Sequence, residues 1–116
     1  MRTFALFGLV LVTHAAIAAP TADQELFKGY LLSGKEPKVK DATWMSDTNL
    51  YVGVVDDGSN RSGFAEYLCL AAANQGVYPE MIKVVDIAKV VREQRFHELG
   101  RSYCPSQSDA PTEVQF

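Results

Sequence analysis

Residues 50–73 read LYVGVVDDGSNRSGFAEYLCLAAA, and the architecture expected of the chain can be worked out from them. The first six residues are rich in β-branched and apolar side chains, which predicts a strand buried on both faces at the centre of a sheet. Residues 56–63 are mostly Asp, Gly, Ser and Asn, the composition of a turn, and Ser62 is placed to cap a following helix. Apolar residues at helical spacing indicate that helix: Phe64, Tyr67, Leu68, Ala71 and Ala72.

A hairpin is expected immediately upstream. Residues 39–45 roughly alternate polar and apolar side chains, which predicts a strand with Ala42 and Trp44 on one face. The polar cluster 46–49 has turn composition, and the strand at 50–55 follows it. Two strands separated by a short turn cluster predict a β-hairpin.

The N-terminal part of the domain predicts a helix over residues 22–33. Thr21 and Gln24 have the spacing of a capping box, and an apolar stripe follows them. Gly34 supplies the stop after the helix.

Downstream, residues 81–87 predict a third strand because β-branched residues are frequent there. Residues 88–94 fit two interpretations: a short helical turn capped by Asp86, or an extension of the strand. Residues 95–104 predict a fourth strand, whose alternation would place side chains on two faces. One face would carry His97, Leu99 and Tyr103, and the other Phe96 and Cys104.

These elements predict an α+β fold with the order α-β-β-α-β-β. The expected structure is a small, four-stranded, mainly antiparallel sheet with two helices, mostly on one face, and one disulfide. A single domain would span residues 19–104. Residues 105–116 are polar and contain proline, so they are expected to form a disordered tail.

Residues 1–18 have the pattern of a cleavable signal peptide. Arg2 precedes a short apolar run, and Ala16-Ile17-Ala18 fits the small-x-small cleavage rule. A membrane anchor is the alternative, but the run is interrupted by polar residues and is shorter than the ~20 apolar residues of a spanning helix. The sequence therefore predicts a periplasmic or secreted protein with no membrane span after cleavage.

The two cysteines, Cys69 and Cys104, are expected to form a disulfide in an oxidising compartment. The chain-entropy estimate for a loop of this length is about 3–4 kcal/mol of stability, a large share for a small domain. Catalytic or metal-binding thiols are the alternative, but the spacing is not that of a C-x-x-C motif.

Charge limits the classes of partner. Cleavage after Ala18 removes Arg2, one of 11 basic residues, and leaves 10 basic against 14 acidic residues, a net charge of −4. The acidic residues are spread along the chain, which argues against nucleic acid or an anionic membrane as the partner. No motif for a cofactor is present, so none is expected.

The turn at residues 56–63 is the first candidate site. Asp56 and Asp57 begin a run of oxygen ligands, but the spacing of a calcium loop is not fulfilled, so no metal is expected. Arg61 and the following helix N-terminus could hold an anion, which the two aspartates would repel. Asn60 opens an N-x-S sequon, a glycosylation acceptor in a eukaryotic host only.

Two classes of function remain open. The first is a binding protein with no catalysis of its own, acting as an inhibitor, an immunity-type protein or an accessory factor on a protein partner. Its contact surface is expected to combine the turn with two aromatic anchors: Asp56, Asp57, Asn60, Arg61, Trp44 and Tyr51. The second is a small secreted hydrolase or effector that would use Asp56, Asp57, Glu66 or His97. The alternative role of Trp44 is simply that of a core residue.

Overall fold

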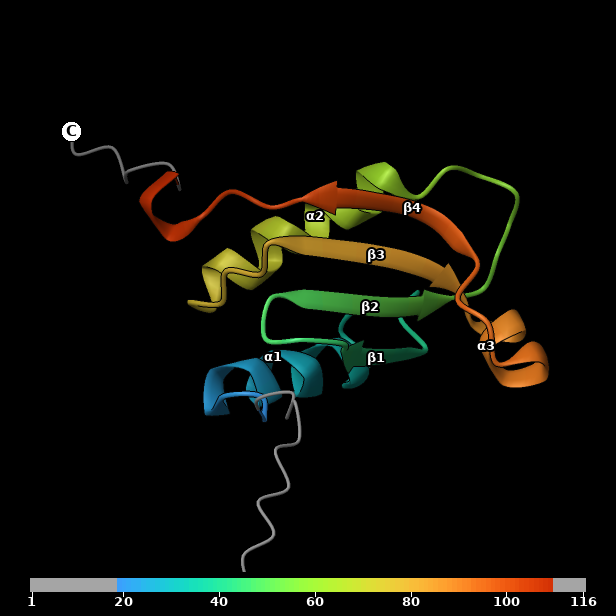
Figure 1. Cartoon of the computed structure of the whole chain (residues 1–116), viewed down its shortest axis with the longest axis horizontal. Coiled ribbons are helices and arrows are strands. Elements are labelled where there is room, and N and C mark those ends of the chain that lie inside the picture. Colours follow the sequence, from blue (N-terminus) through green and yellow to red (C-terminus); the bar gives the residue numbers. More distant parts are fainter. Residues whose placement is uncertain (1–18, 110–116) are drawn as a thin grey trace, which may run out of the picture.

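The computed structural model describes residues 19–109, so the predicted signal peptide (1–18) and residues 110–116 lie outside the described part of the chain. The elements follow in the order shown in Figure 1. They are α1 (Ala22–Leu32), β1 (Asp41–Trp44), β2 (Asn49–Val54), α2 (Ser62–Asn74), β3 (Met81–Asp86), α3 (Ile87–Glu93), β4 (Glu98–Tyr103) and a 3-10 turn, η1 (Gln107–Asp109).

The four strands form one mixed sheet in the order β1-β2-β3-β4 (Figure 1). The outer pairs, β1–β2 and β3–β4, are antiparallel, whereas β2 and β3 run parallel. A parallel pair needs a crossover connection, and α2 provides it. The predicted α+β class, the mostly antiparallel sheet, the β1–β2 hairpin and the central place of β2 are confirmed.

The predicted element order is incomplete because a third helix follows β3. The carboxylate of Asp86 accepts a hydrogen bond from the amide of Ala88 at 2.9 Å, so it caps the N-terminus of α3. The helix ends at Gln94, which has a left-handed φ of 52°. Of the two interpretations of residues 88–94, the helical one is therefore correct. β4 consequently begins at Glu98 instead of residue 95.

The start of α1 follows the sequence prediction closely. The Thr21 hydroxyl accepts from the amide of Gln24 at 3.1 Å, and the Gln24 side chain accepts from the amide of Thr21 at 2.9 Å. This capping box satisfies two amides that the helix leaves free. Phe27 and Leu31 on the inner side of α1 are fully buried.

The start of α2 differs from the prediction. Ser62 is the first helical residue, and Arg61 stands in the N-cap position without a side-chain cap. Asn60 takes the capping role that was expected of Ser62, because its side-chain oxygen accepts from the amide of Ser62 at 2.7 Å.

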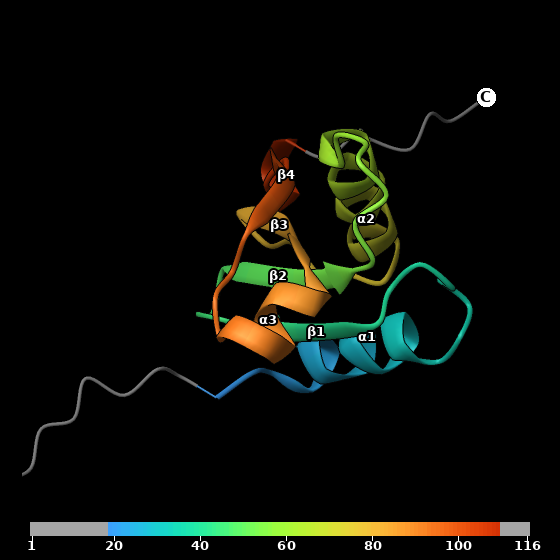
Figure 2. The same cartoon turned by 90° about the vertical axis from the view of Figure 1, so that its right-hand side faces the viewer.

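The core lies between the sheet and the helices. α2 packs against β3 and β4, while α1 packs against β1, so both cover the same face of the sheet (Figure 2). Alternate residues of the strands point into this layer. The fully buried side chains in this layer include those of Phe27, Leu31, Leu50, Val52, Val54, Leu68, Ile82 and Val84.

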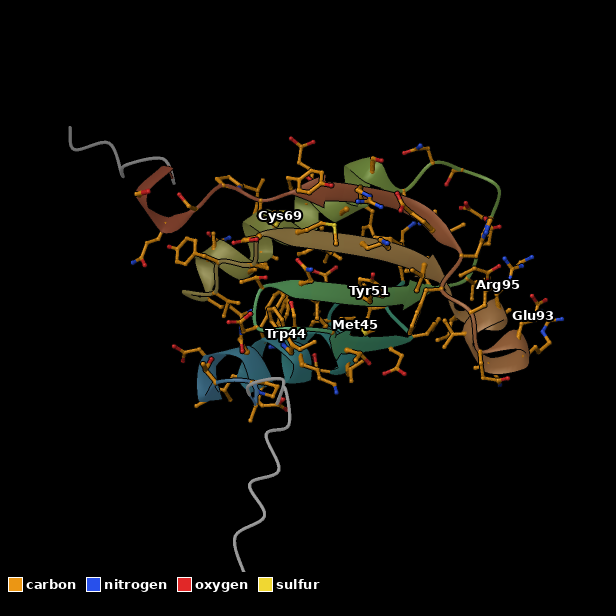
Figure 3. All side chains as sticks on the ribbon, viewed as in Figure 1. Trp44, Met45, Tyr51, Cys69, Glu93 and Arg95 are labelled. Carbon is orange, nitrogen blue, oxygen red and sulfur yellow. A yellow bond between two sulfur atoms is a disulfide. The ribbon has the colours of Figure 1, made fainter. Side chains whose placement is uncertain are left out.

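The predicted disulfide is confirmed. Cys69 on α2 and Cys104, directly after β4, are bonded with their α-carbons 5.3 Å apart. Figure 3 places Cys69 between the helix and the sheet. The bond ties the middle of α2 to the end of the last strand.

The predicted tail begins with five described residues. Gln107–Asp109 form the turn η1 within this segment, and the disorder of the tail stays a prediction. Residues 110–116 lie outside the described part. Within residues 19–109, no helix combines the length and the apolar character needed to cross a membrane.

Candidate functional site

The face of the sheet opposite α1 and α2 is the candidate site, and we call it the open face. In Figure 2, neither of these helices lies on this side of the strands, and α3 lies only at one end. Strand register brings side chains of neighbouring strands together there: Tyr51 pairs with Lys83, and Lys83 with Arg101. Three strands therefore contribute one transverse row of polar and aromatic side chains.

The row is connected by short contacts. The Lys83 ammonium lies 4.8 Å from the centre of the Tyr51 ring and 3.7 Å from a carboxylate oxygen of Glu98. Glu98 also accepts two hydrogen bonds from Arg101, at 3.0 Å and 2.6 Å. Arg101 donates in addition to the Tyr103 hydroxyl at 2.9 Å. One carboxylate thus serves two cations.

A β-bulge makes this arrangement possible. Val84 pairs with Gly100 and Val85 with Glu98, so Leu99 is an extra residue in β4. In a regular strand, residues three apart point to opposite faces. The bulge reverses the alternation, and Glu98 and Arg101 meet on the open face although they are three residues apart.

Because of this bulge, side chains of the last strand do not lie on the faces that the sequence predicted. Leu99 packs against the core, whereas Tyr103 contacts Arg101 on the open face. The prediction that Leu99 and Tyr103 share a face is therefore wrong. Phe96 and Cys104 are also separated, because Phe96 packs on the Tyr51 ring while Cys104 packs against the core.

The carboxylate of Glu98 and the guanidinium of Arg101 on the open face shift each other's pKa. The hydrogen bonds from Arg101 lower the pKa of the Glu98 carboxyl, and the charges of Arg101 and Lys83 act in the same direction. The same pair raises the pKa of the Arg101 guanidinium above its ordinary value. The row combines two cationic side chains, Lys83 and Arg101, with the carboxylate of Glu98, so it carries a net positive charge.

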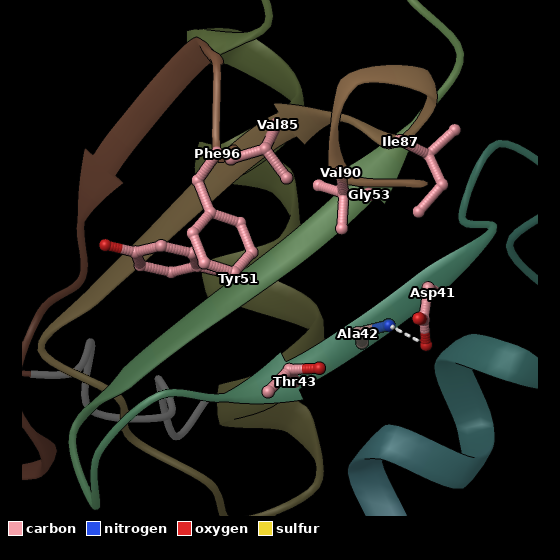
Figure 4. Close-up of a pocket in the computed structure, with 9 residues that line it drawn as sticks. All are labelled: Asp41, Ala42, Thr43, Tyr51, Gly53, Val85, Ile87, Val90 and Phe96. Carbon is pink, nitrogen blue, oxygen red and sulfur yellow. Dashed lines mark hydrogen bonds between the residues drawn. The ribbon is translucent and has the colours of Figure 1, made fainter. Parts of the chain in front are cut away.

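A small hollow lies beside the row, where α3 approaches β1 and β2 (Figure 4). The Phe96 ring meets the Tyr51 ring edge to face, with centroids 5.1 Å apart, and forms one wall. Gly53 leaves room for Ile87, because a Cβ on Gly53 would lie 2.8 Å from the end of the Ile87 side chain. The remaining lining comes from Asp41, Ala42, Thr43, Val85 and Val90.

The two predicted aromatic anchors have different surroundings. Tyr51 is half-buried on the open face, next to Phe96 and Lys83. Trp44 is 9% exposed, and its indole N–H donates to the carbonyl of Gln24 at 3.1 Å. Of the two roles left open for Trp44, an exposed anchor or a core residue, the core role is correct, because its side chain joins β1 to α1.

The turn after β2 is built from its own polar side chains. Asp56 accepts from the amide of Gly58 at 2.8 Å, and Asp57 accepts from the amide and hydroxyl of Ser59 at 3.0 Å and 2.5 Å. The Ser59 hydroxyl lowers the pKa of the Asp57 carboxyl most, and the backbone of Ser59 and the charge of Arg61 add to this. Both carboxylates are exposed and act as turn acceptors.

The predicted catalytic residues are dispersed over the fold. Asp56 and Asp57 lie in the turn, Glu66 is exposed on α2, and His97 is exposed between α3 and β4. Across residues 19–109, no hydrogen bond or ion pair joins any two of these four side chains. The described part of the chain also has no group of three or more His, Cys, Asp or Glu residues that could hold a metal ion.

Sequence reasoning missed most of the open face. Lys83 interrupts an apolar strand, and this exception in the pattern was the available signal. Glu98 and Arg101 gave no comparable signal, because their meeting depends on the bulge.

No family model matches the chain, and no curated protein and no solved structure resembles it significantly. The geometry of the described residues is therefore the basis for a functional hypothesis.

Proposed function

We propose that this is an exported protein that acts by binding a protein partner through the open face of its sheet. The partner surface would present a carboxylate within an apolar patch. The protein would perform no catalysis of its own, and an inhibitor, an immunity-type protein or an accessory factor would fit this role.

The observation that carries the proposal is the exposure of aromatic and arginine side chains on the open face. Tyr103 is 70% exposed and Phe96 is 46% exposed, and Arg101 lies beside Tyr103. Tyrosine and arginine are the residues that most often dominate the binding energy of protein interfaces. Among residues 19–109, only α3 covers one end of this face. The strands therefore offer a preformed surface, and little ordering would be needed on binding.

The chemistry of the partner follows from the charges. Lys83 and Arg101 share the single carboxylate of Glu98, which leaves one positive charge in excess. A carboxylate on the partner would neutralise this charge, while apolar side chains would cover Tyr103 and Phe96. Complementary charge also favours correct docking over wrong partners.

The compartment is supported by two features. The sequence predicts a signal peptide over residues 1–18, and Cys69 and Cys104 are joined in a disulfide. Disulfides persist mainly outside the reducing cytosol. Both features favour a periplasmic or secreted protein.

The test uses the mature, oxidised chain as bait in an extract of the envelope and medium of the producing organism. We expect one stoichiometric protein partner, whose affinity is then measured with the purified partner. The change Tyr103→Ser removes an exposed anchor, and it should weaken binding about tenfold or more, as expected for a central aromatic residue.

The matched control is Leu70→Ser, which removes an exposed apolar side chain from α2, on the other side of the molecule. It should leave the affinity unchanged. Equal weakening by both changes, or no effect of Tyr103→Ser, would show that the open face is not the binding surface. If no stoichiometric partner is retained and a peptide or peptidoglycan substrate is turned over instead, the binding function itself is wrong.

A further inference from the structure

A second surface feature lies away from the open face. The loop between α1 and β1 and the turn after β2 border an open surface hollow of about 340 Å³. Its lining is formed by Pro37, Lys38, Lys40, Val55, Asp57 and Arg61.

The lining carries three cations and one carboxylate. In the part of the chain that the structure describes, neither Lys38 nor Lys40 takes part in an ion pair, and the ammonium of Lys40 donates only to the carbonyl of Pro37 at 3.1 Å. Asp57 lies 3.4 Å from Arg61, and its side chain is 56% exposed. The hollow therefore has a net charge of +2.

The Arg61 guanidinium has more N–H donors than the described residues provide acceptors for. The residue is only 8% exposed, and its Nη2 donates to the carbonyl of Val55 at 3.0 Å. Its Nε is buried, and no residue between 19 and 109 accepts a hydrogen bond from it. A guanidinium has five N–H donors, and a buried donor without an acceptor is costly.

The fold holds this guanidinium in place. The amide of Arg61 donates to the carbonyl of Leu99 at 2.9 Å, and the residue stands at the N-cap of α2. The positive end of the helix dipole adds to the positive potential at this position. The backbone of Arg61 is therefore fixed by Leu99, and its guanidinium is held by the carbonyl of Val55.

The aspartates of the turn do not oppose an anion as strongly as the sequence indicated. Asp56 does not line the hollow, and its carboxylate accepts from the amide of Gly58. Asp57 is the one carboxylate in the lining, and the Ser59 hydroxyl and amide already bind it.

We propose that this hollow binds a divalent oxyanion of the phosphate type, held by Arg61 together with Lys38 and Lys40. The net charge of the hollow matches the charge of about −1.5 to −2 that a phosphate group carries at neutral pH. Arginine provides paired donors for phosphate oxygens, and lysines contribute point charges. The phosphate would be free inorganic phosphate or the terminal phosphate of a small phosphomonoester, both of which carry this charge.

The test is a titration of the mature, oxidised protein, followed by NMR of backbone amides and arginine side chains at constant ionic strength. One arm uses inorganic phosphate and another uses glycerol phosphate, which stands for a small phosphomonoester. We expect saturable shifts at Lys38, Lys40 and Arg61 in at least one arm and none with chloride. Tighter binding of glycerol phosphate would identify a phosphomonoester as the source, and tighter binding of inorganic phosphate the free ion.

The double change Lys38→Gln and Lys40→Gln should weaken binding about tenfold or more, because it removes two charge-assisted contacts from exposed positions. The control is Lys28→Gln with Lys89→Gln, which removes the same charge from α1 and α3 without touching the hollow. Asp57→Asn should tighten binding severalfold. Shifts that do not saturate, equal shifts with chloride, or equal weakening by the control pair would overturn the proposal.

Discussion

The α-carbon of Gly100 on β4 lies directly against the backbone of Ser62 at the start of α2. A Cβ on Gly100 would be 2.3 Å from the amide nitrogen of Ser62 and 2.4 Å from the carbonyl carbon of Arg61. The amide of Arg101 also faces the Ser62 hydroxyl at 3.4 Å, and Arg61 donates to Leu99. The N-terminus of α2 thus covers part of the outer edge of β4, which protects the edge from pairing with another chain.

Gly100→Ala should therefore destabilise the protein. The methyl group would meet rigid backbone, which cannot move as a flexible side chain can, so we expect a loss of about 1–3 kcal/mol in the free energy of unfolding. Urea unfolding of the oxidised protein measures this loss. Gly63→Ala is the control, because Gly63 lies in α2 facing open space, and alanine there should be neutral or stabilising. Equal stability of wild type and Gly100→Ala would contradict the close contact.

A second prediction concerns the acid dependence of Glu98. Hydrogen bonds from Arg101 lower the pKa of this carboxyl in the folded state below its ordinary value of 4.5. A depressed pKa means that the stabilisation is complete above the unfolded value and is lost as the pH falls through the folded value. The stability advantage of wild type over Glu98→Gln should therefore shrink below about pH 4.5.

Unfolding of both proteins by urea at a series of pH values checks this prediction. Glu66→Gln is the matched control, because no cation contacts Glu66 in the described part of the chain. Its difference from wild type should stay constant over the same range. A constant difference for Glu98→Gln as well would mean that the Arg101 contact does not stabilise the carboxylate.

Patterns that depend on neighbours in the sequence predicted the fold well. The capping box of Thr21 and Gln24 and the hairpin need only local geometry, and both are present as expected. The disulfide was predicted from the expected oxidising compartment and the even number of cysteines, and it is present. In contrast, the parallel pairing of β2 with β3 depends on strand order, which no local pattern specifies.

The candidate site was harder to predict from the sequence than the fold was. Alternation assumes a regular ladder, so one extra residue, Leu99, was enough to reverse the predicted faces of β4. Trp44 was ambiguous for a different reason: an aromatic residue on a short edge strand can anchor a partner or fill the core. Only the position of α1, whose Gln24 carbonyl accepts from the Trp44 indole, decides between these roles.

Reduction of the Cys69–Cys104 disulfide should lower stability strongly. Opening a loop with a sequence separation of 35 is expected to cost about 3–4 kcal/mol, and each kcal/mol shifts the melting temperature of a small domain by about 4–8 °C. The oxidised protein should therefore melt more than about 10 °C above the reduced one. Thermal unfolding with and without reductant measures this difference, and a double Cys→Ala variant insensitive to reductant is the control. Coincident melting curves would contradict the stabilising role.

Glu36 has a buried carboxylate that links α1 and α2 through hydrogen bonds. It is 7% exposed, and its Oε2 accepts hydrogen bonds from the hydroxyl of Tyr30 on α1 at 3.0 Å and from the hydroxyl of Tyr67 on α2 at 2.5 Å. These bonds stabilise the protonated phenols next to a negative charge. The hydrogen bond to Glu36 accordingly raises the pKa of Tyr30, and it raises the pKa of Tyr67 to about 12.

The stability of the protein should therefore fall at high pH. A folded-state pKa above the ordinary phenol value of 10.0 means that the contribution of Tyr67 is complete below pH 10 and is lost as the pH rises through about 12. Ultraviolet titration of tyrosine should show a late-ionising phenol that disappears in Tyr67→Phe and ionises earlier in Glu36→Gln. Asp47→Asn, which removes an exposed carboxylate that contacts neither tyrosine, should leave the titration unchanged. If the late tyrosine ionisation persists in Glu36→Gln, the Glu36 carboxylate is not the cause of the raised pKa of Tyr67.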